Sequence, residues 1–486
     1  MSIIKVENLT FAYPSSYDNI FENVNFQIDT DWKLGFVGRN GRGKTTFLNL
    51  LQGKFEYSGK IIKSVEFDYF PYPVRDKSSL TEDILRKVCP TAEEWQIMRE
   101  LSYLDVDYDC LYRPFDTLSN GEQTKVLLAA LFLNEGRFLL IDEPTNHLDT
   151  QARELLSAYL RKKKSFILVS HDRHFLDGCV DHILSLNRAN IEVQSGNFSS
   201  FMTNFERQQE FERRQNSRLQ NDIQRLQETA KRTANWADAV EASKIGAADK
   251  GYVGHKSAKM MKRAKVVEAR QQKEIEQKSN LLKNVEVESA LKISPLWYRS
   301  DRLASFSSVA PVYDGKVVCA PMTFEIKRGD RIALEGKNGS GKSSLLKLLC
   351  GQLIGHLGKV EVGSNLIISY VPQDTSHLQG RLADFAASNK IDERLFKAIL
   401  QKMGFDHTQF EKDISDFSDG QKKKTLIARS LCEQAHLYVW DEPLNYIDIY
   451  SRIQIEKLLE EFRPTMIFVE HDKAFQDKIA TSVIHI

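Results

Sequence analysis

The feature that most constrains this chain is a long segment that occurs twice. The run GRNGRGKTT (38–46) returns as GKNGSGKSS (336–344), which places Lys44 and Lys342 298 positions apart. Three later motif pairs keep offsets of 299, 299 and 300, namely LSNGEQ (118–123) with FSDGQK (417–422), IDEP (141–144) with WDEP (440–443), and VSHD (169–172) with VEHD (469–472). A repeat of this length predicts two copies of one domain, and 486 residues leave room for a smaller third part.

The segment between the copies has a different composition. From 205 to 292 it lacks proline, holds glycine only near its middle, and is dominated by charged residues and glutamine. Apolar residues recur at helical spacing on both sides of 244–254, which predicts an antiparallel helical hairpin with its tip in that stretch. Arms of about 35 residues would reach roughly 50 Å at helical rise. The predicted domains are therefore 1–204, 205–292 and 293–486.

Overall composition excludes few function classes. The chain has 67 basic and 66 acidic residues, so any basic partner surface must be local. Its six cysteines are scattered without a close pair, which argues against a zinc site or disulfides and favours reduced cytosolic thiols. The first residues lack the pattern of a signal peptide, and no run of about 18 apolar residues occurs. We therefore expect a cytoplasmic protein without a membrane span.

The first repeated run has the pattern of a phosphate-binding loop. Its glycines allow backbone N–H groups to wrap a triphosphate, while Lys44 meets the terminal phosphates and Thr45 binds Mg²⁺. Lys342 and Ser343 repeat the arrangement. A single match can arise by chance in a flexible loop, but two matches in register cannot reasonably do so. The sequence predicts two sites for ATP and Mg²⁺.

Acidic residues and a histidine follow two further repeated strands. Asp142 and Asp441 end apolar runs that are typical of buried parallel strands, and there each can hold Mg²⁺. The glutamate that follows each aspartate can orient or activate the attacking water. A lone histidine is usually structural, but one that recurs after a second apolar strand in both copies favours a role beside the γ-phosphate. The predicted catalytic residues are Glu143, Glu442, His171 and His471.

The combination of these motifs resembles the ABC ATPase superfamily, since 119–123 looks like its signature motif and recurs after 417. The resemblance covers both halves and implies an α/β fold with two tandem ABC-type P-loop domains joined by the helical hairpin. It also implies a head-to-tail pairing within one monomer. The Lys44 site would be closed by Ser418 and Gly420, and the Lys342 site by Ser119 and Gly121.

The resemblance supplies further site residues. The family stacks adenine on an aromatic residue upstream of the lysine, and Tyr13 and Tyr313 match, although either can instead be ordinary strand packing. The residues predicted to bind ATP are Tyr13, Gly38, Asn40, Gly41, Gly43, Lys44, Thr45, Thr46, Ser119, Gly121, Tyr313, Gly336, Asn338, Gly339, Gly341, Lys342, Ser343, Ser344, Ser418 and Gly420. Those predicted to contact Mg²⁺ are Thr45, Asp142, Ser343, Gln373 and Asp441.

The two copies also depart from each other. Gln373 matches the family's metal- and water-contacting glutamine, whereas the first copy has Tyr72 at that place. The second signature has Asp419 where glycine is common, and the segment 444–448 differs from 145–149. Both glutamates are intact, so we expect two competent but unequal sites.

Two ABC domains without a membrane domain, joined by a long charged hairpin, resemble the ABC-F family of ribosome-binding translation factors. Residues 231–270 hold ten basic and four acidic side chains, and this excess of six positive charges suits RNA phosphates. A charge-rich hairpin is more often simply solvated, but apolar and aromatic groups at the tip favour stacking on unpaired bases. The predicted RNA-contacting residues are Lys244, Ile245, Lys250, Tyr252, Val253 and Lys256.

The segments DKGYVG (249–254), KMMKR (259–263), LTFAY (9–13) and GRNGRGK (38–44) resemble the Lsa-type antibiotic-resistance branch. This resemblance implies binding to the 50S subunit at the tRNA exit site, with contacts to 23S rRNA and P-site tRNA. The hairpin would point at the peptidyl transferase centre and dislodge lincosamides, streptogramin A and pleuromutilins.

Two alternatives stay open from the sequence. A housekeeping ABC-F translation factor would share every ATPase motif and differ only at the tip. An ATPase subunit of a drug-export ABC transporter would need a membrane partner and would not require the hairpin.

Overall fold

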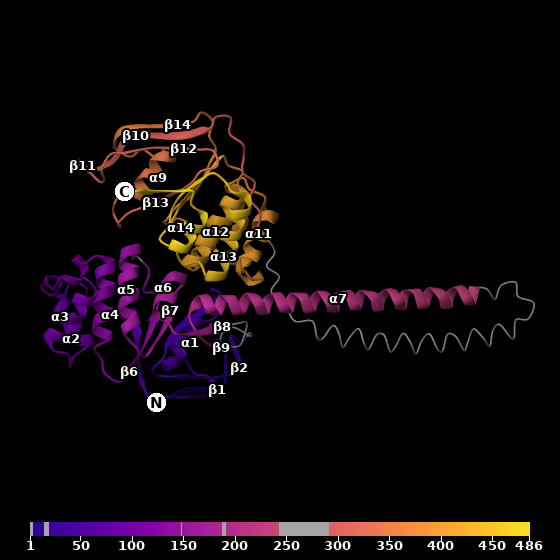
Figure 1. Cartoon of the computed structure of the whole chain (residues 1–486), viewed down its shortest axis with the longest axis horizontal. Helices are drawn as coiled ribbons and strands as arrows, with labels where there is room; N and C mark the ends of the chain where they lie inside the picture. The colour runs from indigo at the N-terminus through magenta and orange to yellow at the C-terminus, as the bar shows by residue number, and fades with distance from the viewer. Residues whose placement is uncertain (1–2, 14–18, 147, 187–190, 243–290) are drawn as a thin grey trace, which may run out of the picture. The chain divides into compact units, whose positions relative to one another are not determined.

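The computed structural model describes residues 3–13, 19–146, 148–186, 191–242 and 291–486 (Figure 1). The chain forms two compact units, one made of Met1–Phe201 with Ser289–Ile486 and the other of Met202–Glu288. Both repeated copies lie in the first unit.

The first copy contains strands, α-helices and short 3-10 helices (η). In chain order they are β1 (Ile3–Phe11), β2 (Phe21–Asp29), β3 (Lys33–Gly38), α1 (Lys44–Leu51), β4 (Ser58–Ile62), β5 (Glu66–Phe70), α2 (Thr81–Val88), α3 (Glu94–Tyr103), η1 (Tyr108–Tyr112), η2 (Phe115–Thr117), α4 (Asn120–Leu131), β6 (Arg137–Asp142), α5 (Thr150–Lys162), β7 (Phe166–Val169), α6 (Arg173–Cys179), β8 (His182–Leu186) and β9 (Ile191–Ser195).

The strands of the first copy form two sheets. Strands β5, β6, β7, β3 and β8 run parallel in that order, and β9 adds an antiparallel strand beside β8. Strands β2, β1 and β4 make a separate antiparallel sheet. Parallel strands need crossover connections, and α1, α5 and α6 supply them after β3, β6 and β7. The residues 138–141 of β6 are all buried, as the apolar run predicts for a strand covered on both faces.

The second copy repeats this plan. Its elements are β10 (Arg302–Tyr313), β11 (Lys316–Val317), β12 (Met322–Lys327), β13 (Arg331–Glu335), α9 (Lys342–Leu349), β14 (His356–Val362), β15 (Ile368–Val371), α10 (Leu382–Ser388), α11 (Glu393–Lys402), η3 (His407–Glu411), η4 (Ile414–Asp416), α12 (Asp419–Cys432), β16 (Leu437–Asp441), α13 (Ile449–Phe462), β17 (Met466–Val469), α14 (Lys473–Ile479) and β18 (Ser482–His485).

The sheets of the second copy have the same strand order as those of the first. Strands β15, β16, β17, β13 and β18 form the parallel sheet, and β10 pairs antiparallel with β11, β12 and β14. Two equivalent α/β copies therefore follow one another in the chain, as the repeat predicts.

The parallel sheet explains why the repeated motifs meet. In the first copy β3 ends at Gly38, β6 at Asp142 and β7 at Val169, and β7 lies between the other two strands. Because the carboxyl ends of parallel strands share one edge, the P-loop, the acidic pair and the histidine come together there. The second copy brings β13, β16 and β17 together in the same way.

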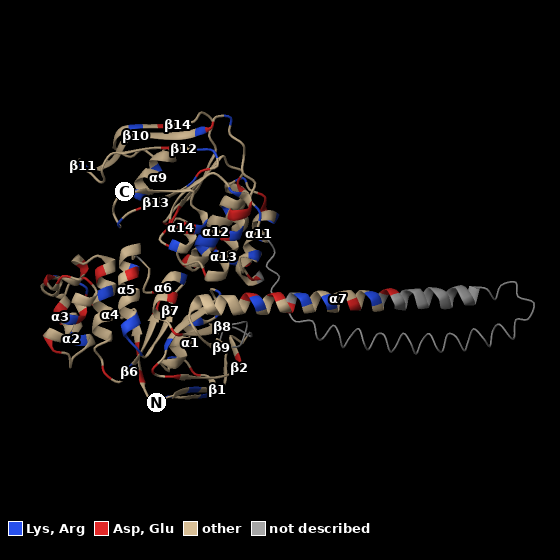
Figure 2. Cartoon of the chain, in the orientation of Figure 1, with Lys and Arg blue, Asp and Glu red and all other residues tan. Residues whose placement is uncertain are grey.

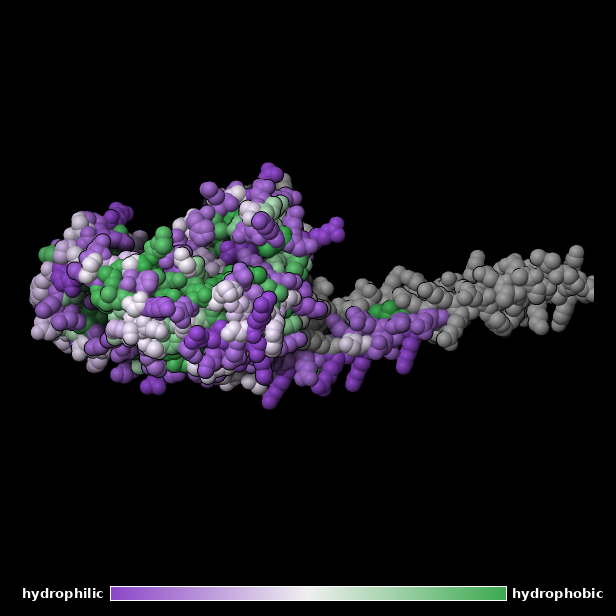
Figure 3. All heavy atoms as spheres, turned by 90° about the horizontal axis from the view of Figure 1, so that it is seen from above, coloured by the Kyte–Doolittle hydropathy of each residue, from purple (hydrophilic) through white to green (hydrophobic). Residues whose placement is uncertain are grey.

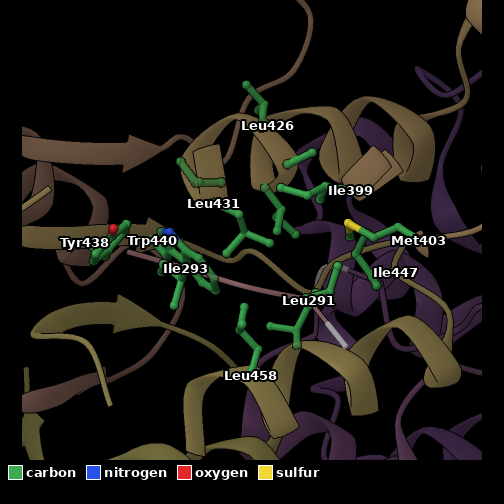
Figure 4. Packing of buried hydrophobic residues seen from close by; sticks show 14 of the residues in the cluster. Leu291, Ile293, Ile399, Met403, Leu426, Leu431, Tyr438, Trp440, Ile447 and Leu458 are labelled. Carbon is green, nitrogen blue, oxygen red and sulfur yellow. The ribbon is translucent and has the colours of Figure 1, made fainter. Parts of the chain in front are cut away.

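Each copy has its own apolar core. In the second copy, Trp440 and Tyr438 of β16 are fully buried against side chains of α11 and α12 (Figure 4). The indole N–H of Trp440 donates to Ser430 Oγ at 3.0 Å, which satisfies its only polar atom. Leu291 and Ile293 join this core, so the chain enters the second copy directly after the segment 243–290. Burial of each such side chain contributes about 1.5–3 kcal/mol.

The helix α7 (Phe198–Ala242) follows the first copy and contains 45 residues. Phe198 and Phe201 are buried in the first unit, and basic and acidic side chains alternate along the described stretch beyond them (Figure 2). This stretch is mainly hydrophilic on its visible face (Figure 3). Of the helices in the described ranges, none combines the length and apolar character that crossing a bilayer requires. The predicted tip and second arm fall within 243–290, outside the described residues.

Candidate active sites

The two P-loops hold their lysines in the same way. Lys44 Nζ donates to Gly38 O at 2.7 Å, to Arg39 O at 3.3 Å and to Asn40 Oδ1 at 3.2 Å. In the second copy Lys342 Nζ donates to backbone oxygens of the same loop turn, at 2.7 and 2.8 Å. Gly43 has a φ of 97°, and a Cβ there would lie 2.6 Å from Ile20 Cγ2. Only glycine fits this position, because both the backbone conformation and the space exclude a side chain.

A hydroxyl and a carboxylate meet beside each lysine. Thr45 Oγ1 donates to Asp142 Oδ2 at 2.9 Å, and Ser343 Oγ donates to Asp441 Oδ1 at 3.1 Å. The second oxygen of Asp441, Oδ2, is buried and has no hydrogen-bond partner among the described residues. Oxygen atoms of this kind suit Mg²⁺, which prefers one or two protein oxygens together with phosphate and water. These four side chains fit Mg²⁺, and its binding there stays a prediction.

Each predicted catalytic glutamate lies beside its histidine. His171 Nε2 is 3.4 Å from Glu143 Oε1, and His471 Nε2 is 3.7 Å from Glu442 Oε1. Both glutamates have positive φ values, 50° and 47°, in the turn that leaves the strand. A non-glycine residue rarely adopts this conformation, and such strain concentrates at active sites.

The two glutamates differ in their ionisation. Burial, with a further contribution from Asp142, raises the pKa of Glu143 to about 8. Burial also acts on Glu442, but the contact with His471 and the charge of Lys423 outweigh it and hold the pKa of Glu442 below its ordinary value. Burial and the nearby Lys44 keep the pKa of His171 well below its ordinary value, so this histidine is neutral. The two sites therefore have different electrostatic environments.

The two candidate adenine-stacking tyrosines make the same polar contact. Tyr13 Oη lies 2.9 Å from Thr46 Oγ1, and Tyr313 Oη lies 2.9 Å from Ser344 Oγ. Tyr13 also packs edge-on against Phe11. Tyr313 is 45 % exposed and lines the cavity described next. Both tyrosines are thus anchored to the helix that follows the P-loop, and their stacking on adenine stays a prediction.

One large cavity combines residues from both copies. It has a volume of about 1270 Å³ and is lined by the second P-loop, with Lys342 and Ser343, and by the first signature, with Ser119 and Gly121. Ser119 caps α4 by accepting a hydrogen bond from Glu122 N at 3.2 Å. Other residues on its wall are Tyr313, Asn338, Gly339, Gly341, Ser344, Gln373, Glu442 and His471. The structure places these predicted site residues around one space, and ATP binding there stays a prediction.

The first P-loop contacts the second copy directly. Asn40 Nδ2 donates to Tyr446 O at 2.6 Å. A Cβ on Gly420 would lie 2.5 Å from that same Tyr446 oxygen and 2.9 Å from Asn40 Nδ2. Ser418 caps the helix α12 that begins beside this contact. The second signature is therefore adjacent to the first P-loop.

The departures between the copies have structural consequences. Tyr69 of β5 donates its hydroxyl to Asp142 Oδ2 at 3.1 Å, the same oxygen that accepts from Thr45. The equivalent Tyr370 hydroxyl of β15 is buried and has no hydrogen-bond partner among the described residues. Only the first copy therefore has a tyrosine attached to the carboxylate predicted to hold Mg²⁺.

Sequence reasoning missed several residues that support the sites. Arg153 and Arg452 each donate to the aspartate after the catalytic histidine, at 3.0 Å to Asp172 and Asp472. These arginines recur at the repeat offset of 299, which is the signal that would have revealed them. Lys423 is 2 % exposed, and burial lowers its pKa to about 8. It gives no such signal, because its counterpart in the first copy is a threonine.

The predicted RNA-contacting residues cannot be placed. Lys244, Ile245, Lys250, Tyr252, Val253 and Lys256 lie outside the described residues. Their contact with RNA stays a prediction.

Comparison with sequence families adds an independent finding. Residues 21–146 and 319–445 match the family model described as "ABC transporter", so the match includes both copies and just over half of the chain.

Individual relatives extend over nearly the whole chain. The ribosome protection protein VmlR of Bacillus subtilis (strain 168) is 26% identical, with 97% of this chain and 84% of that protein covered. ABC transporter F family member 2 of Arabidopsis thaliana is 24% identical, with 99% and 76% covered. A solved complex of an archaeal ribosome recycling factor with a ribosomal stalk protein has a TM-score of 0.66 at 18% identity, with 98% of this chain and 87% of that chain covered. At that identity the likeness concerns the fold.

Proposed function

The chain belongs to the ABC transporter family of ATPases and, within it, to the ABC-F family, and on this premise we propose that it protects ribosomes from antibiotics. The chain is an ATP hydrolase. In the proposal it binds the ribosome and uses ATP binding and hydrolysis to dislodge drugs from the peptidyl transferase region.

The observation that carries the proposal is the extent of the similarity to VmlR. The aligned region covers 97% of this chain, and this share is too large to omit the segment between the ATPase domains. The helix α7, which has 45 residues, begins in the first copy at Phe198 and continues into that segment, and its length corresponds to roughly 65 Å at helical rise.

The ATP sites supply the energy in this proposal. Lys44 and Lys342 bind the terminal phosphates, and Thr45 with Asp142, or Ser343 with Asp441, holds Mg²⁺, which neutralises phosphate charge when bound. The glutamate after each aspartate orients the attacking water and accepts its proton. Signature residues from the opposite copy close over the nucleotide, so ATP binding draws the copies together and hydrolysis releases them.

The proposed partner is the 50S subunit, bound at the tRNA exit site by a single copy of this chain. The segment between the domains contacts 23S rRNA and P-site tRNA through the basic and apolar residues of 244–256. The excess of positive charge in 231–270 supports this partner, because RNA binding gains from counterion release.

A translation extract without membranes tests the proposal, because nothing can be pumped there. The protein with ATP is expected to restore synthesis halted by a lincosamide or a pleuromutilin. It is not expected to restore synthesis halted by a drug at the distant decoding site.

Deletion of 245–253 provides the matched variant. It removes the proposed tip and leaves both ATP sites intact, so nucleotide binding and ribosome binding are expected to remain while rescue is lost. Failure of the intact protein to rescue, together with lower drug accumulation in cells, would support a transport role instead. Failure in both assays, with altered translation in the absence of drug, would support a housekeeping translation factor.

A further inference from the structure

Lys423 is a buried lysine that hydrogen-bonds only to backbone carbonyls in the described part of the chain. Its side chain lies in the first turns of α12 and is 2 % exposed. The ammonium group donates to Pro372 O at 2.8 Å, to Gln373 O at 3.3 Å and to Asp441 O at 3.0 Å. Three carbonyl acceptors match the three donors of an ammonium group, so the charge is buried with its hydrogen bonds satisfied.

These three carbonyls belong to two different parts of the second site. Pro372 and Gln373 follow β15 in the loop predicted to contact metal and water. Asp441 ends β16 and immediately precedes the catalytic Glu442. Lys423 therefore connects the glutamine loop directly to the strand end that carries the two carboxylates.

The first copy lacks this connection. Thr124 occupies the position equivalent to Lys423, at the repeat offset of 299, and Tyr72 replaces the glutamine. Near the end of the corresponding strands in the first copy, Tyr69 of β5 donates instead to the carboxylate of Asp142. A threonine is too short to reach three carbonyls on two segments.

We propose that Lys423 is a positioning residue of the second ATP site, which holds Gln373 and Glu442 in the geometry for hydrolysis by tying their two segments together. The first site lacks such a residue, so the two sites hydrolyse ATP at different rates. This inference rests on the ATPase activity of the family and does not depend on the ribosome as partner.

The test isolates one site at a time. In a Glu143→Gln protein only Glu442 supports hydrolysis, and there Lys423→Thr introduces the residue that the first copy already has. We expect kcat to fall about tenfold, because a misplaced catalytic group costs rate, and KM for ATP to stay within about twofold, because the P-loop is untouched. Lys423→Met keeps the apolar stem and removes the donors, so it is expected to behave like Lys423→Thr.

The same substitutions in a Glu442→Gln protein are the control. There only the Glu143 site turns over, and its rate is expected to change less than about twofold. A second readout needs no turnover. In nucleotide-free protein, hydrogen exchange of the peptide 370–376 is expected to be faster in Lys423→Thr and Lys423→Met than in the parent, because the loop loses its attachment.

Several results would overturn the proposal. A parental kcat in Lys423→Met would show that only the stem packing matters. An equal loss of kcat in the Glu143→Gln and Glu442→Gln proteins would show general damage to the fold. Unchanged hydrogen exchange of the peptide 370–376 would show that Lys423 does not hold this loop. Absence of hydrolysis in the Glu143→Gln protein itself would also overturn the proposal. The second site would then not hydrolyse ATP, and Lys423 could not position groups for that reaction. Ribosomes are absent from these assays, so none of these results bears on ribosome protection.

Discussion

Glu143 and Glu442 occupy equivalent places and differ in what surrounds them. Burial and the neighbouring Asp142 outweigh the charge of Lys44 at Glu143, and its pKa rises to about 8. Glu442 has His471 and Lys423 beside it, and its pKa stays below the ordinary value. Near neutral pH, in the nucleotide-free protein, Glu143 is therefore mainly neutral and Glu442 is charged.

This difference predicts that Glu143 makes stability depend on pH between about 5.5 and 8, whereas Glu442 does not. The unfolded chain releases the proton of Glu143 near the ordinary pKa of 4.5, whereas the folded protein keeps it up to about 8. Between these values the folded state binds more protons, so the stability that Glu143 contributes is lost as pH rises. We compare the melting temperature of Glu143→Gln with that of the parent at each pH. The difference, variant minus parent, is expected to increase by about 2 °C or more between about pH 5.5 and pH 8.

Glu442→Gln is the matched control for that measurement. Its carboxylate is already ionised over the same range in both the folded and unfolded states, so its effect on the melting temperature should not grow with pH. If the difference in melting temperature between Glu143→Gln and the parent stays constant or falls as pH rises, Glu143 is not buried in its neutral form. Nucleotide-free protein is required, because ATP and Mg²⁺ bring new charges to the site.

Replacing both glutamates tests their catalytic role. Glu143→Gln with Glu442→Gln preserves the shape of both side chains and removes the two proposed bases. ATP binding is expected to persist while hydrolysis falls at least about 100-fold. Equilibrium binding of a fluorescent ATP analogue and phosphate release, measured on the same preparation, check both statements. Hydrolysis at the parental rate would show that other residues activate the water.

The sequence predicted these glutamates because they recur in register, but it could not predict their environments. Repeated motifs identify which residues are equivalent. The charge of Lys423 on α12 lowers the pKa of Glu442, and Tyr69 on β5 donates to Asp142, the neighbour of Glu143. Neither of these contacts follows from spacing along the chain, because neither has the same counterpart in the other copy.

At the scale of elements, α4 brings the first signature to the second P-loop. Its cap Ser119 lines the same cavity as Lys342, so a bulky acidic side chain at 119 would place charge where the phosphates of ATP are expected. We predict that Ser119→Glu lowers nucleotide occupancy of the Lys342 site at least about tenfold and that of the Lys44 site much less. Photolabelling with azido-ATP, followed by peptide mapping, measures each site separately.

Ser418→Glu on α12 is the reciprocal variant. It is expected to weaken the Lys44 site first, since Gly420 on the same turn lies against Asn40 of that P-loop. Loss of occupancy at Lys44 alone in the Ser119→Glu protein would contradict the predicted pairing of signatures and P-loops.

The elements themselves were largely predictable. Four-residue apolar runs such as 138–141 predict buried strands, and the glycine-rich loops after β3 and β13 are found where the motifs place them. The antiparallel sheet of β1, β2 and β4 was not predicted, because it pairs segments that are separated in the chain by connections that include β3 and the P-loop helix. Their pairing depends on packing against α1, which no local pattern encodes.

At the scale of the whole molecule, a buried ion pair joins the two copies. Arg173 of α6 contacts both carboxylate oxygens of Glu456 on α13, one of them at 3.1 Å, and Glu456 is fully buried. Lys473, the counterpart of Arg173, pairs with Glu154 at 3.6 Å, and both side chains are about half exposed. The ion pair of Arg173 with Glu456 therefore contributes more to the contact between the copies than that of Lys473 with Glu154.

Removing one member of the buried pair should destabilise this arrangement. Glu456→Ser introduces the residue of the first copy, Ser157, and leaves Arg173 with the more distant Asp472, at 3.7 Å, as its ion-pair partner among the described residues. We expect a loss of about 3 kcal/mol and a melting temperature lower by several degrees. Glu154→Ala, which removes the exposed pair, is expected to cost less than about 1 kcal/mol. Equal effects of the two variants in differential scanning fluorimetry would contradict the asymmetry.

The most direct test of the proposed function follows the drug itself. Ribosomes carrying a radiolabelled lincosamide are mixed with the protein and ATP, and the label that remains on ribosomes is measured after rapid filtration. We expect the intact protein to release the drug, whereas the protein lacking 245–253 should bind the same ribosomes and leave the drug in place. Ribosomes that bind the intact protein and retain the drug would contradict the proposed function.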